Sequence, residues 1–174
     1  MDHNIDEIIE YHHTLGTPYI GCSYSPTSTH EEMERLERVL KTAQEKAAKY
    51  GIQVLYHNHA HEFVPLDGVR PIDEIAKWCM LEPDTYWVFH AGDNPCEFLR
   101  KYRSRVGLIH LKDGADGKGT SLGEGSNDLK AIVETGKDIG VEWAIAEIEN
   151  EAEDAESLRD AKNSFAYMTD VLGL

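Results

Sequence analysis

Helical and strand-like segments alternate along most of this 174-residue chain, and this alternation restricts its fold more than any other feature. The strand-like segments are short and continuously apolar, as parallel strands are when helices cover both of their faces. Strands that alternate with helices of this length indicate βαβ units and a parallel sheet. We expect five strands, at residues 18–23, 52–56, 85–89, 106–111 and 143–148.

The helices between these strands carry recognisable start and stop signals. Thr29 and Glu32 have the spacing of a capping box at a helix start. Gly16, Gly51 and Gly140 each follow an apolar-periodic segment and indicate a helix end. We expect helices at 4–15, from Thr29 to Gly51, at 72–78, 95–102 and 129–139, and a Gly-rich loop at 114–125. A last helix should bury a stripe made of Leu158, Ala161, Phe165, Met168 and Leu172.

Charge and composition disfavour several classes of partner. The formal net charge is −15, so nucleic-acid backbones and anionic membranes should both be repelled. No apolar run approaches the roughly 18 residues that a membrane helix needs, and the acidic N-terminal segment lacks the apolar core of a signal peptide. The cysteines, Cys22, Cys79 and Cys96, are odd in number and lack CxxC spacing, which favours reduced thiols. We therefore expect a cytoplasmic protein.

Polar side chains gather at the carboxyl ends of three of the predicted strands, and Asp84 sits beside a fourth, the one at 85–89. In a parallel α/β protein these ends share one face, and that face holds the active site. Mixed imidazole and carboxylate ligands there suit Mn²⁺, Mg²⁺, Co²⁺ or Zn²⁺ better than a soft metal. The residues are His57, Asn58, His59, Asp84, His110, Lys112, Asp113, Glu147 and Glu149.

Five ordered segments that cover most of residues 50–150 carry a family resemblance. They read YHNHAHEF at 56–63, DTYW at 84–87 followed by GDNP at 92–95, HLKD at 110–113, GEG at 123–125, and EWAIAE at 142–147. Together they resemble the xylose-isomerase-like superfamily of sugar phosphate isomerases and epimerases.

The resemblance implies a TIM-type (β/α) barrel in which four side chains hold one divalent metal. Carried over to this chain, the ligands are Glu62, Asp84, His110 and Glu147. Many relatives place a Glu at the strand end where this chain has His57. The implied reaction is isomerisation or epimerisation of a sugar or keto-sugar, phosphorylated or not.

In such a reaction the metal makes the C–H next to a carbonyl more acidic, and a nearby side chain moves the proton. The candidates for this proton transfer are Glu147, Glu62, His57 and His59. Lys112 is expected to stabilise the oxyanion or to hold a distal oxygen of the substrate.

Each of these residues also has a purely structural interpretation. Glu147 inside an apolar strand would form a buried ion pair with Lys112. Asp84 after a proline would be a turn residue, and Glu62 a solvated loop acid. His57 and His59 point to opposite faces if the strand continues, so one of them would be a core histidine.

Length decides how much of a barrel this chain can form. A complete barrel has eight βα units and about 250 residues, whereas residues 1–174 provide five strands as a single, incomplete domain. Against the family pattern, the first three βα units are missing. The open sheet edges predict self-association of the chain, unless it is a fragment of a longer protein or folds as an open sheet.

Two other functions are compatible with the same pattern. In the first, the chain keeps the metal-site residues but acts as a silent structural or binding partner, in place of an enzyme. The second, metal-dependent DNA repair on the same fold, is disfavoured by the net charge of −15.

Overall fold

The computed structural model describes residues 4–115, 117–148 and 154–174. The chain divides into two compact units, Met1–Glu82 and Pro83–Leu174, which we call the N-terminal and C-terminal units. The single domain over 1–174 stays a prediction. Asp116, in the expected glycine-rich loop, and Glu149, expected at a strand end, lie outside the described residues.

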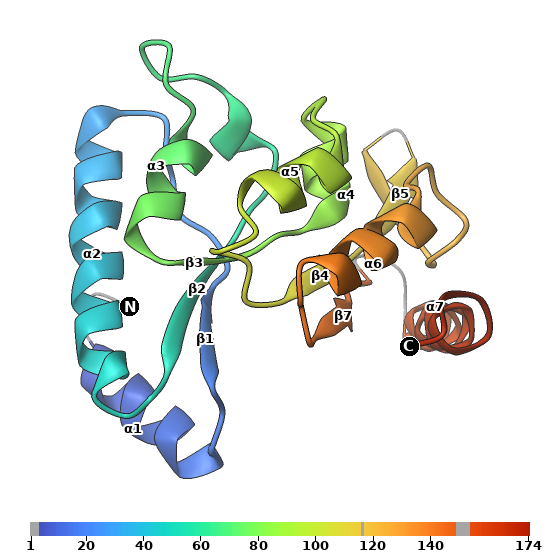
Figure 1. Ribbon diagram of the computed structural model, residues 1–174, viewed down its shortest axis with the longest axis horizontal. Coiled ribbons are helices and arrows are strands. Elements are labelled where there is room, and N and C mark those ends of the chain that lie inside the picture. Colours follow the sequence, from blue (N-terminus) through green and yellow to red (C-terminus); the bar gives the residue numbers. More distant parts are fainter. Residues whose placement is uncertain (1–3, 116, 149–153) are drawn as a thin grey trace. The chain divides into compact units, whose positions relative to one another are not determined.

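A three-stranded parallel sheet forms the centre of the N-terminal unit (Figure 1). Its strands are β1 (Tyr19–Cys22), β2 (Gln53–His57) and β3 (Met80–Glu82), in the order β1-β2-β3. The register pairs Tyr56 with Leu81 and His57 with Glu82. The carboxyl ends of β2 and β3 therefore present His57 and Glu82 side by side.

The helices of this unit are α1 (Ile5–Leu15), α2 (His30–Ala48) and α3 (Pro71–Trp78), with a short 3₁₀ turn, η1 (His61–Phe63). The predicted capping box is confirmed, because Thr29 accepts from the Glu32 N–H and Glu32 accepts from the Thr29 N–H. Gly16 ends α1 with a φ of 72°, a left-handed conformation that glycine adopts at little cost. Helix α2 contacts β2 and α3, and buried residues of both helices form the core together with strand residues such as Val54, Tyr56 and Leu81.

The C-terminal unit contains two further parallel strands and a small hairpin. Strand β4 (Ile109–Leu111) pairs with β7 (Ala144–Ala146), and β5 (Asp113–Ala115) pairs antiparallel with β6 (Lys118–Thr120). The helices are α4 (Thr85–His90), α5 (Pro95–Lys101), α6 (Leu129–Asp138) and α7 (Asp154–Tyr167), followed by a π turn, η2 (Met168–Leu172). The core of this unit is made of Leu99, Val106, Ile109, Leu111, Leu122, Leu129, Ile132, Val133 and Leu172.

The strand predicted at 85–89 is wrong, because these residues form helix α4. Asp84 caps this helix by accepting a hydrogen bond from the Trp87 N–H at 2.9 Å. The aromatic and β-branched residues instead bury one helical face through Thr85, Tyr86 and Val88. Strand β3 lies just before them, at Met80–Glu82. β-propensity depends on context, and the cap decides the local structure here.

Two predictions for the second half of the chain need correction. Part of the expected loop at 114–125 forms the β5–β6 hairpin. The expected apolar stripe of the last helix is right only at its end, where Leu172 is buried and Met168 packs against the core, because Leu158 and Phe165 are 56% and 68% exposed. Helix α7 instead buries Asp160 and Ser164, which bond to the Ser121 hydroxyl and the Leu122 N–H. Polar anchoring of the 121–122 turn outweighs the hydrophobic period.

Five parallel strands alternate with helices, as predicted, and they form no closed barrel in the part of the chain that the structure describes. Within the described residues, no helix is both long and apolar enough to cross a membrane.

Candidate functional site

In the C-terminal unit, the backbone brings Asp84 and His110 together. The His110 N–H donates to the Pro83 carbonyl at 2.9 Å, and the Thr85 hydroxyl donates to the His110 carbonyl at 3.0 Å. Asp84 and His110 thus form an isolated parallel bridge. This pairing extends the edge of β4 and fixes an imidazole next to a buried carboxyl group.

Glu147 joins this pair from the neighbouring strand. Its N–H donates to the Leu111 carbonyl at 2.9 Å, which continues the β4–β7 pairing past the end of β7. Its Oε2 lies 2.5 Å from Nδ1 of His110, and its Oε1 accepts from Nζ of Lys112 at 3.2 Å. One carboxylate is therefore held between an imidazole and an ammonium group.

Asp84 is fully buried and lies within 4.8 Å of Glu147, measured between carboxylate oxygens. Burial raises the pKa of Asp84 to about 7, because an anion loses hydration there. The Trp87 N–H, Lys112 and His110 lower the pKa of Asp84, whereas the nearby charge of Glu147 raises it further. Asp84 is thus a carboxyl group whose charge depends on neighbouring cations near neutral pH.

Lys112 is almost completely buried, with 1% of its surface exposed. Its Nζ lies 4.8 Å from the centre of the Trp87 ring, within the range of a cation–π contact. The Asn127 side-chain amide donates to the Lys112 carbonyl at 3.1 Å. Packing and hydrogen bonds therefore fix the position of this cation.

Asp113, the last residue of the HLKD segment, organises the following loop. Its carboxylate accepts four backbone N–H groups, from Gly114, Gly123, Gly125 and Asn127, at 2.9–3.1 Å. A Cβ at Gly125 would overlap with Asp113 Oδ1, so a side chain there is excluded. Sequence reasoning placed Asp113 among the strand-end polar residues but did not foresee this role. The GEG segment was the signal, since two of these donors are its glycines.

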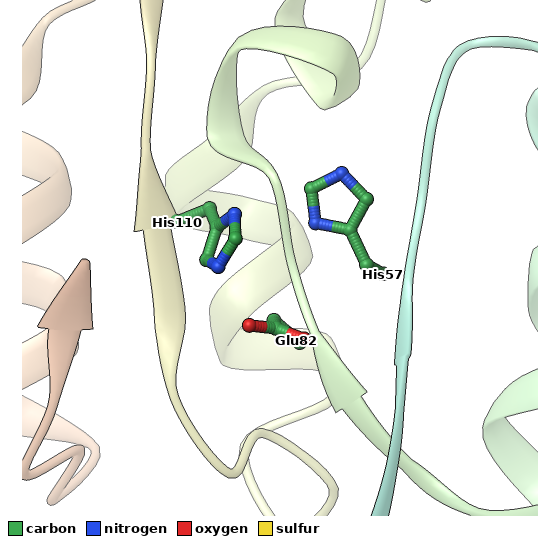
Figure 2. A group of neighbouring side chains, drawn as sticks. All are labelled: His57, Glu82 and His110. Atoms are coloured by element: carbon green, nitrogen blue, oxygen red, sulfur yellow. The ribbon is translucent and has the colours of Figure 1, made fainter. Parts of the chain in front are cut away.

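In the N-terminal unit, Glu82 is a buried acid that sequence reasoning missed. It ends β3 beside His57, and ligand atoms of the two side chains lie within 4.8 Å. Figure 2 shows these two side chains, together with that of His110 on β4. Gly21 leaves room for Glu82, because a Cβ there would lie 2.9 Å from its Oε2. A carboxylate just before Pro83 was the available signal, and the misplaced strand at 85–89 concealed it.

Glu62 lies in the same unit and is fully buried in η1. Its Oε1 accepts from the Tyr56 hydroxyl at 2.8 Å, and its Oε2 accepts from the His59 N–H at 2.8 Å. Nε2 of His61 lies 3.4 Å from Oε1. Burial, and then the Glu62 charge, raise the pKa of Tyr56 far above its usual value. Glu62 is therefore a buried acid fixed by local donors.

The predicted site residues thus fall into two groups, one in each unit. The structure brings Asp84, His110, Lys112 and Glu147 together in the C-terminal unit. His57, His59 and Glu62 belong to the N-terminal unit, where the rings of His57 and His59 are 5.0 Å apart.

The donor set of the C-terminal group fits a divalent metal ion. It offers one imidazole and two carboxylates from three segments, the mixed nitrogen and oxygen ligands that Mn²⁺, Co²⁺ and Zn²⁺ accept. Two acids this close also favour a cation between them, since like charges in a buried place repel.

Two named relatives are similar in sequence to this chain over half of its length or more. The chain is 28% identical over 171 residues to the inosose dehydratase of Lacticaseibacillus casei, with 82% of this chain and 56% of the relative covered. An inosose dehydratase 2 of Bacillus cereus is 33% identical over 96 residues, covering 51% of this chain and 30% of the relative. The chain therefore spans about half the length of the first of these curated relatives.

Solved structures share the fold. A sugar phosphate isomerase/epimerase from Parabacteroides distasonis superposes with a TM-score of 0.79 at 22% identity, covering 96% of this chain and 66% of that one. The IolI protein with a bound zinc atom superposes with a TM-score of 0.73 at 19% identity, covering 97% and 67%. The family model described as "Xylose isomerase-like TIM barrel" matches residues 3–170. The chain therefore belongs to the xylose isomerase-like TIM barrel family.

Proposed function

We propose that this chain is the metal-binding part of a divalent-metal-dependent isomerase or epimerase that acts on a sugar or keto-sugar. The observation that carries the proposal is the C-terminal group, in which Glu147 lies between His110 and Lys112 with Asp84 beside it. The names of the relatives, a sugar phosphate isomerase/epimerase and an inosose dehydratase, support this chemical class.

Asp84, His110 and Glu147 hold the metal in this proposal, whereas the fourth-ligand role of Glu62 stays a prediction from the family resemblance alone. The metal is Mn²⁺, Mg²⁺, Co²⁺ or Zn²⁺ by ligand type. The zinc atom bound to the IolI protein supports the last of these. A bound metal would supply Lewis-acid polarisation of a substrate carbonyl.

The protein's own groups then move the proton next to that carbonyl. Glu147 is the proposed base, because its carboxylate is 26% exposed and two neighbouring donors orient it. Lys112 has its charge fixed by packing, so it is placed to stabilise negative charge on a nearby oxygen. His57, His59 and Glu62 remain predicted proton carriers.

Metal analysis of the purified protein, followed by a deuterium test, examines this proposal. Wild-type protein should carry close to one equivalent of divalent metal in this site, and Glu147→Gln should lose it. Glu142→Gln, at an exposed position five residues away, is the matched control and should keep the metal. In ²H₂O, a panel of ketoses and keto-polyols should exchange one C–H next to the carbonyl in the wild type only.

The outcomes separate three functions. Exchange with return of an isomer indicates isomerase or epimerase chemistry, whereas exchange with loss of water indicates a dehydratase, as in the curated relatives. If Glu147→Gln leaves the metal content unchanged, or no metal binds, the silent structural or binding partner is the better interpretation.

We also propose that the chain associates with itself in the cytoplasm. In the described residues, β7 pairs with β4 alone. It carries Ile145, which is 42% exposed, next to Trp143, which is 59% exposed. An apolar open strand edge is a template for pairing with another chain. A clean monomer in gel filtration at micromolar concentration would contradict this proposal.

A further inference from the structure

We propose that His59, His61 and Glu62 form a second metal site in the N-terminal unit, selective for a nitrogen-preferring divalent cation such as Zn²⁺. One ligand atom from each of the three residues lies within 4.8 Å of the others. This site gives Glu62 a metal of its own, in place of the fourth-ligand role that the family resemblance predicts. It depends on neither Asp84, His110 nor Glu147.

The distances in this cluster already approach those of a tetrahedral zinc site. Zinc bonds of about 2.0–2.2 Å to nitrogen and oxygen place neighbouring tetrahedral ligands about 3.4 Å apart. Nε2 of His61 lies 3.4 Å from Oε1 of Glu62, and 2.9 Å from the Ser25 carbonyl oxygen. The Ser25 carbonyl accepts the proton on Nε2 of His61 in this contact, so a zinc ion would replace that proton and lie between Nε2, Oε1 of Glu62 and the carbonyl oxygen. A ring nitrogen of His59, within 4.8 Å, would complete the set.

The environment of Glu62 is the second observation that favours a cation. Its carboxylate is fully buried, and the donors that orient it, the Tyr56 hydroxyl and the His59 N–H, are both neutral. Hydrogen bonds from neutral groups orient a carboxylate, as outer partners do around metal ligands, but supply no positive charge, and His61, 3.4 Å away, supplies one only if its imidazole is protonated. A metal ion bound by His61 and Glu62 would balance this buried negative charge.

Ligand type sets this cluster apart from the C-terminal group. Two imidazoles and one carboxylate make up the proposed site, whereas His110 is the single imidazole among the ligands of the C-terminal group. Imidazole ligands suit Zn²⁺, Cu²⁺ and Ni²⁺, while carboxylate-rich sites also accept Mn²⁺ and Mg²⁺. The proposed site therefore binds Zn²⁺ and leaves Mn²⁺ and Mg²⁺ in solution.

Metal binding here would join two loops that follow neighbouring strands. His61 and its bond to Ser25 already connect the segment after β2 with the segment after β1. A metal held by this cluster strengthens that connection and stabilises the folded state by mass action. Zinc should therefore raise the melting temperature through these loops, independently of any turnover.

The test is zinc titration of the chelator-treated chain, followed by a competing zinc indicator and by calorimetry. Wild-type protein should bind two equivalents of Zn²⁺, one of which an excess of Mg²⁺ does not displace. His61→Gln should weaken that equivalent by more than about tenfold, the smallest loss expected when even an outer partner of a metal is removed. Glu62→Gln should weaken the same equivalent because it removes the carboxylate. It keeps the shape of the side chain and its contact with Tyr56, so the fold should be retained.

His30→Gln is the matched control. His30 also lies beside a carboxylate, Asp67, at 2.8 Å, but both side chains are well exposed. This variant should keep both equivalents and the full zinc-dependent rise in melting temperature.

The stoichiometry in two variants decides between the possible outcomes. One equivalent lost in His61→Gln and a different one lost in Glu147→Gln supports the proposal, and it does so even if no substrate turns over. A single equivalent that both variants remove overturns the second site and supports one shared metal. A single equivalent that only Glu147→Gln removes also overturns it. If His61→Gln loses one equivalent and Glu147→Gln loses none, this proposal stands and the C-terminal metal site is contradicted.

Discussion

Nδ1 of His110 lies 2.5 Å from Oε2 of Glu147, and this contact joins the ends of the two parallel strands of the C-terminal unit. The other oxygen of Glu147 accepts from Lys112. Glu147→Gln should lower the stability of the metal-free protein by about 2 kcal/mol, because the hydrogen bonds from charged donors become neutral ones. Urea unfolding with a chelator present measures this change.

The control for that measurement is Glu142→Gln, which should change stability by less than about 0.5 kcal/mol because its side chain is exposed. In a double-mutant cycle with Lys112→Met, the two sites should couple by about 1–3 kcal/mol. A coupling near zero would mean that Lys112 and Glu147 do not interact in solution.

The raised pKa of Asp84, about 7, gives the metal-free protein a distinct pH dependence. Between pH 4 and pH 7 the unfolded chain releases the Asp84 proton while the folded chain keeps it. Stability from this group is therefore present in full below pH 4 and is lost as the pH rises towards and through 7. The loss is on the order of 4 kcal/mol.

Asp84→Asn should remove this loss and also keep the cap on α4, since an asparagine oxygen can accept from the Trp87 N–H. Above pH 7 the metal-free variant should be more stable than the wild type, yet it should bind metal more weakly. Thermal unfolding from pH 4 to 8, with and without metal, measures both effects. Parallel pH curves for the two proteins would refute the role given to Asp84.

Asp113 should control the order of the 121–127 loop. Asp113→Asn removes acceptors for two of the four backbone N–H groups, since its amide nitrogen cannot accept. We expect a loss of about 3 kcal/mol and faster hydrogen exchange at Gly123, Gly125 and Asn127. Asp138→Asn, at an exposed position, is the control and should change neither quantity.

The Tyr56 hydroxyl should stabilise the N-terminal unit through Glu62. Tyr56→Phe leaves a buried carboxylate oxygen without its 2.8 Å donor, which should cost about 2 kcal/mol. If burial and Glu62 raise the Tyr56 pKa as described, this phenol stays protonated at pH 11 in the folded protein. Ultraviolet titration of wild type and variant should then give the same phenolate signal, and an extra ionising tyrosine in the wild type would contradict this.

The choice between helix and strand at 85–89 shows where local patterns are insufficient. The Thr-Tyr-Trp-Val-Phe run has high strand propensity, but one hydrogen bond from the Trp87 N–H to Asp84 begins a helix there. The same error hid Glu82, whose position at a strand end depends on β3 ending before Pro83. Neither fact is contained in the hydrophobic period of the segment.

The sequence by itself determined the family, the alternation of parallel strands with helices, and most of the chemistry at the strand ends. It did so because periodicity, caps and ordered motifs are local properties, as Thr29 with Glu32 and the HLKD segment show. Only the tertiary structure decided which polar groups meet. Glu147 lies between His110 and Lys112, Asp113 accepts four backbone N–H groups, and His61 donates to the Ser25 carbonyl. Such contacts depend on strand register and on the paths of distant loops, which side-chain periodicity along one segment does not encode.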